Sequence, residues 1–186
     1  MKMNKFAMVI GAVMAIAAAS SAYADGSTTN LTGGIVHFKG ELVDGACSVS
    51  TDSVDQIVQL GQHPLHNFKK KGDVSELRPF TIKLEDCDTT IAKTAAVQFT
   101  GAADSVDANL LAIDASQENG QGASGVGIRI LDEKSNVVVP NGAFSAAHNL
   151  IDGKNTLSFK AQYVSTVEKP TAGQANADST FIMQYQ

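Results

Sequence analysis

Short segments of alternating apolar and polar residues recur along the chain, and this pattern limits the fold more than any other feature. The segments lie at residues 80–84, 97–99, 126–130 and 157–163. A period of two residues is typical of a strand with one buried face. Between the segments lie stretches rich in Gly, Pro, Asn and Asp, at residues 101–109, 116–124, 140–142 and 152–155. Such residues reverse a chain. We therefore expect an all-β sandwich, with at most a short helical turn at residues 104–111.

The two ends of the predicted domain are unequal. At the C-terminus, Phe181, Met183 and Tyr185 alternate with other residues up to Gln186, so the last strand has no successor. Near the other end, residues 31–38 form an additional β-forming run. An immunoglobulin-like sandwich needs a closing edge strand, and an open apolar edge invites pairing with another chain. The pattern indicates a surplus strand at the front and a missing strand at the end.

The first 24 residues are typical of a secretory signal. Lys2 and Lys5 precede an apolar run at residues 6–19, and the small-residue stretch after it ends in Ala22-Tyr23-Ala24. This is an A-x-A cleavage pattern, so we predict that the mature chain starts at Asp25. The apolar run is shorter than the roughly 20 residues that cross a bilayer, and we expect no membrane insertion.

The mature chain would have 162 residues, which is enough for one domain with a genuine core. Cleavage removes two of the 14 basic residues and none of the 19 acidic ones, which leaves a net charge of −7. Nucleic acid is therefore an unexpected partner.

Cys47 and Cys87 are the only cysteines. In an exported chain, the simplest interpretation is one disulfide, which would stabilise the fold by roughly 4 kcal/mol for a loop of about 40 residues. A reactive or metal-bound thiol is the alternative, but the C-x-x-C spacing is absent.

Motifs for catalysis or cofactor binding are weak. Residues 120–125 satisfy G-x-G-x-x-G, but a strand pattern follows where a nucleotide site needs a helix. His63 and His66 lack the spacing of a zinc site, and G-x-S-x-G is absent. The acidic residues beside Cys87 are explained as solvated turn residues. We expect no catalytic residues, no metal and no cofactor.

Several segments together resemble the major pilins of type 1 fimbriae, which are assembled by the chaperone–usher route. The resemblance covers essentially the whole mature chain, and it includes Cys47, Gly173 and the penultimate Tyr185. The matching segments are residues 33–41 (GGIVHFKGE), 54–61 (VDQIVQLG), 84–89 (LEDCDT) and 175–181 (ANADSTF).

This resemblance implies an incomplete immunoglobulin-like sandwich, at residues 44–186, that lacks its last strand. A periplasmic chaperone would hold it first, and the N-terminal extension of a neighbouring copy, residues 25–43, would complete it later by donor-strand complementation. An outer-membrane usher and identical subunits are the other implied partners, and the implied location is the cell-surface fimbrium. The donor residues would be Thr32, Gly34, Val36 and Phe38, and the groove residues would be Gly173, Phe181, Met183 and Tyr185.

Two interpretations remain open. A glycine within a β-run marks a bulge or a close approach of another backbone, and we favour close approach for Gly34 because it lies in phase with Val36 and Phe38. A structural shaft subunit is favoured over a minor subunit, tip adaptor or adhesin, because 162 residues cannot hold a receptor domain and tryptophan is absent. The basic stretch at residues 63–71 departs from the family pattern, and we expect it on the outer surface.

Overall fold

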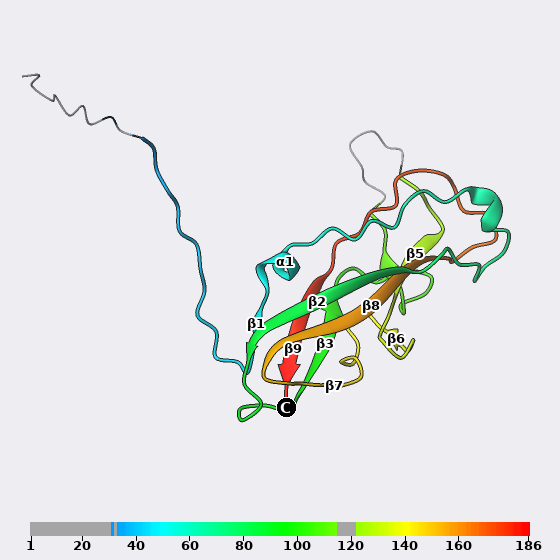
Figure 1. The fold of residues 1–186 in the computed structure, drawn as a ribbon. Coiled ribbons are helices and arrows are strands. Elements are labelled where there is room, and N and C mark those ends of the chain that lie inside the picture. The colour runs from blue at the N-terminus through cyan, green and yellow to red at the C-terminus, as the bar shows by residue number, and fades with distance from the viewer. Residues whose placement is uncertain (1–30, 32, 115–121) are drawn as a thin grey trace, which may run out of the picture. The chain divides into compact units, whose positions relative to one another are not determined.

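The computed structural model describes residue 31, residues 33–114 and residues 122–186. The predicted signal peptide, its cleavage site and Thr32 lie outside these residues. The chain divides near Gly40 into an N-terminal unit and a compact unit, Glu41–Gln186. No helix within the described residues is long and apolar enough to cross a membrane. The regular secondary structure of the compact unit consists mostly of strands with few helices, as predicted (Figure 1).

The larger sheet has six strands and is built around β8 (Gly153–Ser165), whose 13 residues make it the longest strand. On one side, β8 pairs antiparallel with β2 (Arg78–Cys87), and on the other with β5 (Val126–Leu131). Three two-residue strands complete the sheet: β1 (Ser48–Val49) pairs with β2, whereas β4 (Leu111–Ala112) and β6 (Val137–Val138) pair with β5.

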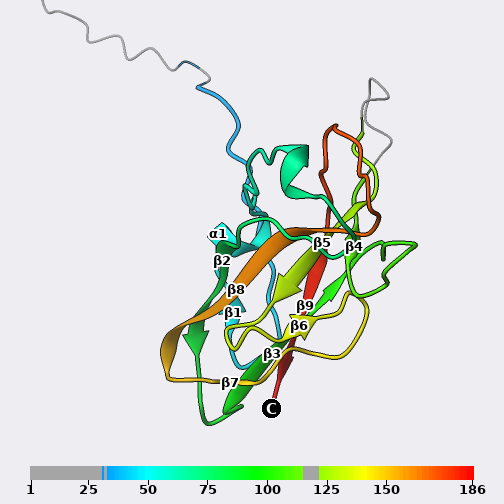
Figure 2. The same ribbon diagram turned by 90° about the vertical axis from the view of Figure 1, so that its right-hand side faces the viewer.

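The smaller sheet has three strands, with β3 (Thr94–Thr100) in the middle. The two-residue β7 (His148–Asn149) lies on one side of β3, and β9 (Thr180–Tyr185) pairs antiparallel with its other side. Figure 2 shows β9 running beside β3 down to the C-terminus. Among the described residues β9 has no second strand partner, so one of its edges is open.

The core lies between the two sheets and confirms the period-two prediction. Ile82, Leu84, Leu157 and Phe159 are at most 3% exposed, and Val97 and Phe99 face them from the smaller sheet. The rings of Phe99 and Phe159 meet edge to face, with centroids 5.2 Å apart. Such aromatic pairs stabilise a core beyond their buried area.

Helices are short. α1 (Thr51–Val54) makes one turn after β1, and the 3₁₀ helix η1 (Leu65–Asn67) lies in the loop before β2. Residues 104–111, where at most a short helical turn was expected, form a hydrogen-bonded turn, with the Leu110 N–H donating to the Asp107 carbonyl at 3.0 Å, and no helix. The Asp104 carboxylate instead accepts the backbone N–H groups of Val106 and Asp107, which fixes a turn before β4.

Candidate functional site

An open groove of about 670 Å³ lies beside the start of β9, a strand with no second strand partner among the described residues. One wall is the segment at residues 53–60, which begins in the last two residues of α1, and the other is the segment at residues 175–179 with Phe181 of β9. The floor consists of side chains from both sheets, namely Phe80, Phe99, Leu111, Ile128, Ile130, Ala161 and Tyr163. Most of these side chains are apolar. The groove is therefore a strip of sandwich core that no strand of the described domain covers.

Side chains, rather than a strand ladder, hold the first wall against β2. Ser53 Oγ accepts the backbone N–H of Lys83 at 3.0 Å, and Gln56 Nε2 donates to the carbonyl of Thr81 at 3.2 Å. Val54 and Ile57 of this wall are 67% and 83% exposed. Large apolar side chains on a groove wall are available to a further partner.

The second wall is held to β8 and β3 by hydrogen bonds. Ser179 Oγ donates to the carbonyl of Thr100 at 3.0 Å, and the Tyr163 hydroxyl donates to the carbonyl of Ala175 at 2.7 Å. Burial raises the pKa of the Tyr163 hydroxyl, so Tyr163 stays a donor across the ordinary pH range. The wall is thus ordered without an occupant in the groove.

The predicted donor segment exposes its apolar side chains. Leu31, Ile35 and Phe38 are 86%, 82% and 92% exposed, and residues 33–40 belong to no strand. A Cβ atom added to Gly34 would meet no other atom within 4 Å. The close approach proposed for Gly34 therefore has no counterpart within a single chain.

The predicted groove residues occupy different positions. Phe181 lines the groove, whereas Met183 and Tyr185 pack against the core farther along β9, and Gly173 is exposed in the connection from β8 to β9. Sequence reasoning missed the wall at residues 53–60 and the floor residue Tyr163. The alternation at residues 157–163 placed Tyr163 on the buried face, but only the fold brings it beneath the opening.

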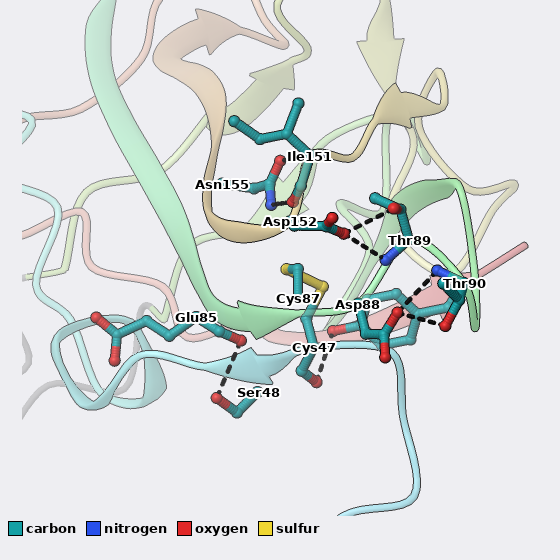
Figure 3. Close-up of a disulfide and its surroundings, with 11 residues drawn as sticks. Cys47, Ser48, Glu85, Cys87, Asp88, Thr89, Thr90, Ile151, Asp152 and Asn155 are labelled. Atoms are coloured by element: carbon teal, nitrogen blue, oxygen red, sulfur yellow. Dashed lines mark hydrogen bonds between the residues drawn. A yellow bond between two sulfur atoms is a disulfide. The ribbon is translucent and has the colours of Figure 1, made fainter.

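A disulfide joins Cys47 to Cys87 and ties the start of the domain to the end of β2 (Figure 3). The Tyr185 hydroxyl donates to the Cys47 carbonyl at 3.4 Å, which links the end of β9 to the same region. Nearby, the Asp152 carboxylate accepts the hydroxyl and the backbone N–H of Thr89 at 2.6 and 2.8 Å. These bonds hold the pKa of Asp152 below its ordinary value of 3.8.

His63 and His66 do not come together as a metal site. His63 Nε2 lies 3.0 Å from the Leu60 carbonyl, and His66 is exposed in η1. Within the described ranges, no group of three His, Cys, Asp or Glu side chains could hold a metal ion. In the basic stretch at residues 63–71, Phe68 is buried and the three lysines are exposed.

Comparisons with known proteins place the groove in context. The model of the family "Fimbrial protein" matches residues 36–186. The uncharacterized fimbrial-like protein SfmA of Escherichia coli K12 is 51% identical over 173 residues, which cover 92% of this chain and 96% of SfmA. The type-1 fimbrial protein A chain of Salmonella typhi is 48% identical, with full coverage of both chains.

Solved structures with the same fold come from pili. A chain from a chaperone–usher pilus superposes with a TM-score of 0.71 at 27% identity, covering 86% of this chain and 99% of that one. The P pilus rod subunit PapA superposes with a TM-score of 0.65 at 26% identity, covering 76% of this chain and all of PapA.

Proposed function

This chain belongs to the fimbrial protein family and is a structural subunit of a type 1-like pilus, and we propose that its groove receives the N-terminal segment of a neighbouring copy. The observation that carries the proposal is the open groove beside β9, which runs over the core of the sandwich. The role is structural rather than catalytic.

The chemistry of the groove fits an extended peptide. The free edge of β9 offers main-chain hydrogen bonds to a strand of any sequence, while pockets along the groove select alternate side chains. The donor segment has bulky apolar side chains at Val36 and Phe38, which are 72% and 92% exposed in the isolated chain. Burying both side chains in a neighbour would contribute roughly 1.5–3 kcal/mol for each.

Donation from one copy to the next generates a filament. The donated segment precedes the domain, and the groove lies within the domain. Each copy therefore inserts its segment into one neighbour and accepts the segment of another neighbour in its groove. Such head-to-tail contacts do not close on themselves and extend into a polymer. The names of the relatives and the PapA fold support a place in the shaft of a surface pilus.

We further propose that the chain is exported to the periplasm after cleavage behind Ala24, with residues 25–43 as the donor extension and residues 44–186 as the pilin domain. An open apolar edge is an aggregation hazard. A periplasmic chaperone that covers the groove, and an outer-membrane usher that exchanges it for the next subunit, would solve this problem.

The test supplies the missing strand within one chain. In a tethered variant, residues 25–38 are deleted, and a copy of residues 30–43 follows Gln186 through a short flexible linker. The tether makes pairing intramolecular, with an effective concentration on the order of millimolar, so we expect a monomer. Its Tm should exceed that of the deletion variant with no appended strand.

Two controls sharpen this test. An appended segment of the same composition in scrambled order should leave the Tm unchanged, because pockets rather than composition set the register. Replacing Gly34 by Leu in the appended copy should lower the Tm, because a side chain would intrude where backbones approach closely. A tethered variant that still aggregates, or melts no higher than the deletion variant, overturns the proposed function.

A further inference from the structure

A series of side-chain contacts connects the two walls of the groove through Tyr163 of β8. The Tyr163 hydroxyl donates to the carbonyl of Ala175 in one wall at 2.7 Å. The ring of Tyr163 meets the ring of His63 edge to face, with centroids 5.8 Å apart. His63 Nε2 in turn lies 3.0 Å from the carbonyl of Leu60, where the other wall ends. Two rings thus connect the backbones of two walls that form no strand pair with each other.

The Leu60 end of this chain of contacts is held from a second direction. Arg78 Nε, from the start of β2, donates to the same Leu60 carbonyl at 3.3 Å. Because a carbonyl only accepts, His63 Nε2 must carry a proton in this contact. Gly61 follows with a φ of +83°, a conformation that glycine adopts readily, and turns the chain out of the wall. The wall therefore ends at a fixed point and not in a loose loop.

We propose that the contact between Tyr163 and His63 is a brace that holds the walls of the empty groove at the spacing a donor strand needs, which makes both side chains positioning residues for strand uptake. This inference rests on the proposed function, since it concerns the same groove. The brace is built from the subunit's own side chains, and it exists before a partner arrives.

The brace should act on the rate of uptake more than on the rate of release. In the empty groove the brace limits changes in the distance between the two walls. The walls therefore lose less conformational freedom when a strand docks. Once the groove is filled, hydrogen bonds to the inserted strand hold both walls, and the brace becomes redundant. A residue with a merely structural role would instead lower the stability of the empty and filled subunits alike.

The test uses the full-length exported subunit, refolded at low concentration, and a fluorescent peptide of residues 30–43. Stopped-flow mixing gives the association rate, and displacement by unlabelled peptide gives the dissociation rate. Tyr163→Phe removes only the hydroxyl that bonds to Ala175. We expect roughly five-fold slower association, because the freed wall must then be ordered during docking, with dissociation changed less than two-fold. His63→Ala should slow association similarly.

Two further variants make the result specific. Thr171→Val removes a hydroxyl that contacts Ser124 Oγ at 2.8 Å in the same β8–β9 connection, away from the groove, and should leave both rates unchanged. In the double variant Tyr163→Phe/His63→Ala, the loss should be smaller than the product of the single losses, because both changes break one chain of contacts.

The outcomes separate the two proposals. If the wild-type subunit takes up no peptide, the proposed function fails. If it takes up peptide and both single variants associate at the wild-type rate, or if association and dissociation change equally, the brace is overturned and the proposed function stands. Should Tyr163→Phe fail to fold, the same outcomes are scored on His63→Ala.

Discussion

β8 and β9 have similar alternating sequences but opposite surroundings. β8 has a long partner on each side, and its inward residues Leu157, Phe159 and Ala161 are at most 5% exposed. β9 pairs only with β3 among the described residues, and none of its side chains is fully buried. The difference shows that an alternating apolar pattern identifies a strand and its two faces, but it does not tell whether a neighbouring strand pairs with each edge. The larger sheet supplies the covered core of the subunit, and the open edge of the smaller sheet is the place where we propose that a neighbouring copy docks.

The largest effect should come from the covered strand. Phe159→Ala removes a ring that stacks on the ring of Phe80, with centroids 5.5 Å apart, and that contacts the ring of Phe99 in the other sheet. This substitution should lower the free energy of unfolding by about 3–5 kcal/mol. Urea denaturation of the tethered variant measures this loss. Ser158→Ala, at an exposed position of the same strand, should change the stability by less than about 0.5 kcal/mol. Comparable losses for the two substitutions would contradict the assignment of the core face.

The disulfide should rank second. Replacing Cys47 and Cys87 by Ser opens a loop with a sequence separation of 40 residues and should cost about 2–5 kcal/mol. Thermal melts with and without reductant measure this cost, because reductant should lower the Tm of the wild type and leave that of the double variant unchanged. A wild-type Tm that is insensitive to complete reduction would refute the prediction.

The open edge should respond differently in its empty and filled states. Phe181 lines the empty groove and is only partly buried, so Phe181→Ala removes few contacts there. In the tethered variant an inserted strand would cover this ring, and the loss should be about 1–2 kcal/mol larger than in the deletion variant without an appended strand. Urea denaturation of both backgrounds gives the comparison. Equal losses in the two states would mean that the strand does not cover Phe181.

The smallest effect should appear in acid. The Thr89 donors lower the folded-state pKa of Asp152, so its contribution to stability is present above the unfolded-state value and is lost as the pH falls through the lower folded-state value. Asp152→Asn should therefore lower the Tm slightly near pH 7. The difference from the wild type should shrink as the pH falls through the lowered folded-state pKa. A Tm difference that persists or grows on acidification would show that the carboxylate charge is not responsible.

The sequence predicted the long strands because each offers enough residues to show its period. β1, β4, β6 and β7 have two residues each, which is too few for any periodicity, and α1 is a single turn. Residues 104–111 form a turn and no helix, because the Asp104 carboxylate bonds locally to the backbone.

The candidate site was predictable only in part. Unequal ends of the alternation pointed to an uncovered last strand, and Phe181 does line the groove. The wall at residues 53–60 was not predictable, because its bonds to β2 join residues 25 and 30 positions apart. The contact between His63 and Tyr163 was not predictable either, because it joins residues 100 positions apart. No local pattern encodes such a pairing.

The position of the disulfide bears on how a filament under tension would carry load. Tension applied to the N-terminal segment would reach the domain just before Cys47, where the first strand is β1. β1 has only two residues, so its hydrogen bonds to β2 could break one pair at a time. The covalent bond to Cys87 transfers the force directly to the end of β2, whose ten residues lie antiparallel to β8. Force along that ladder must shear many hydrogen bonds at once, so the subunit would resist extension as a unit instead of unravelling from its front.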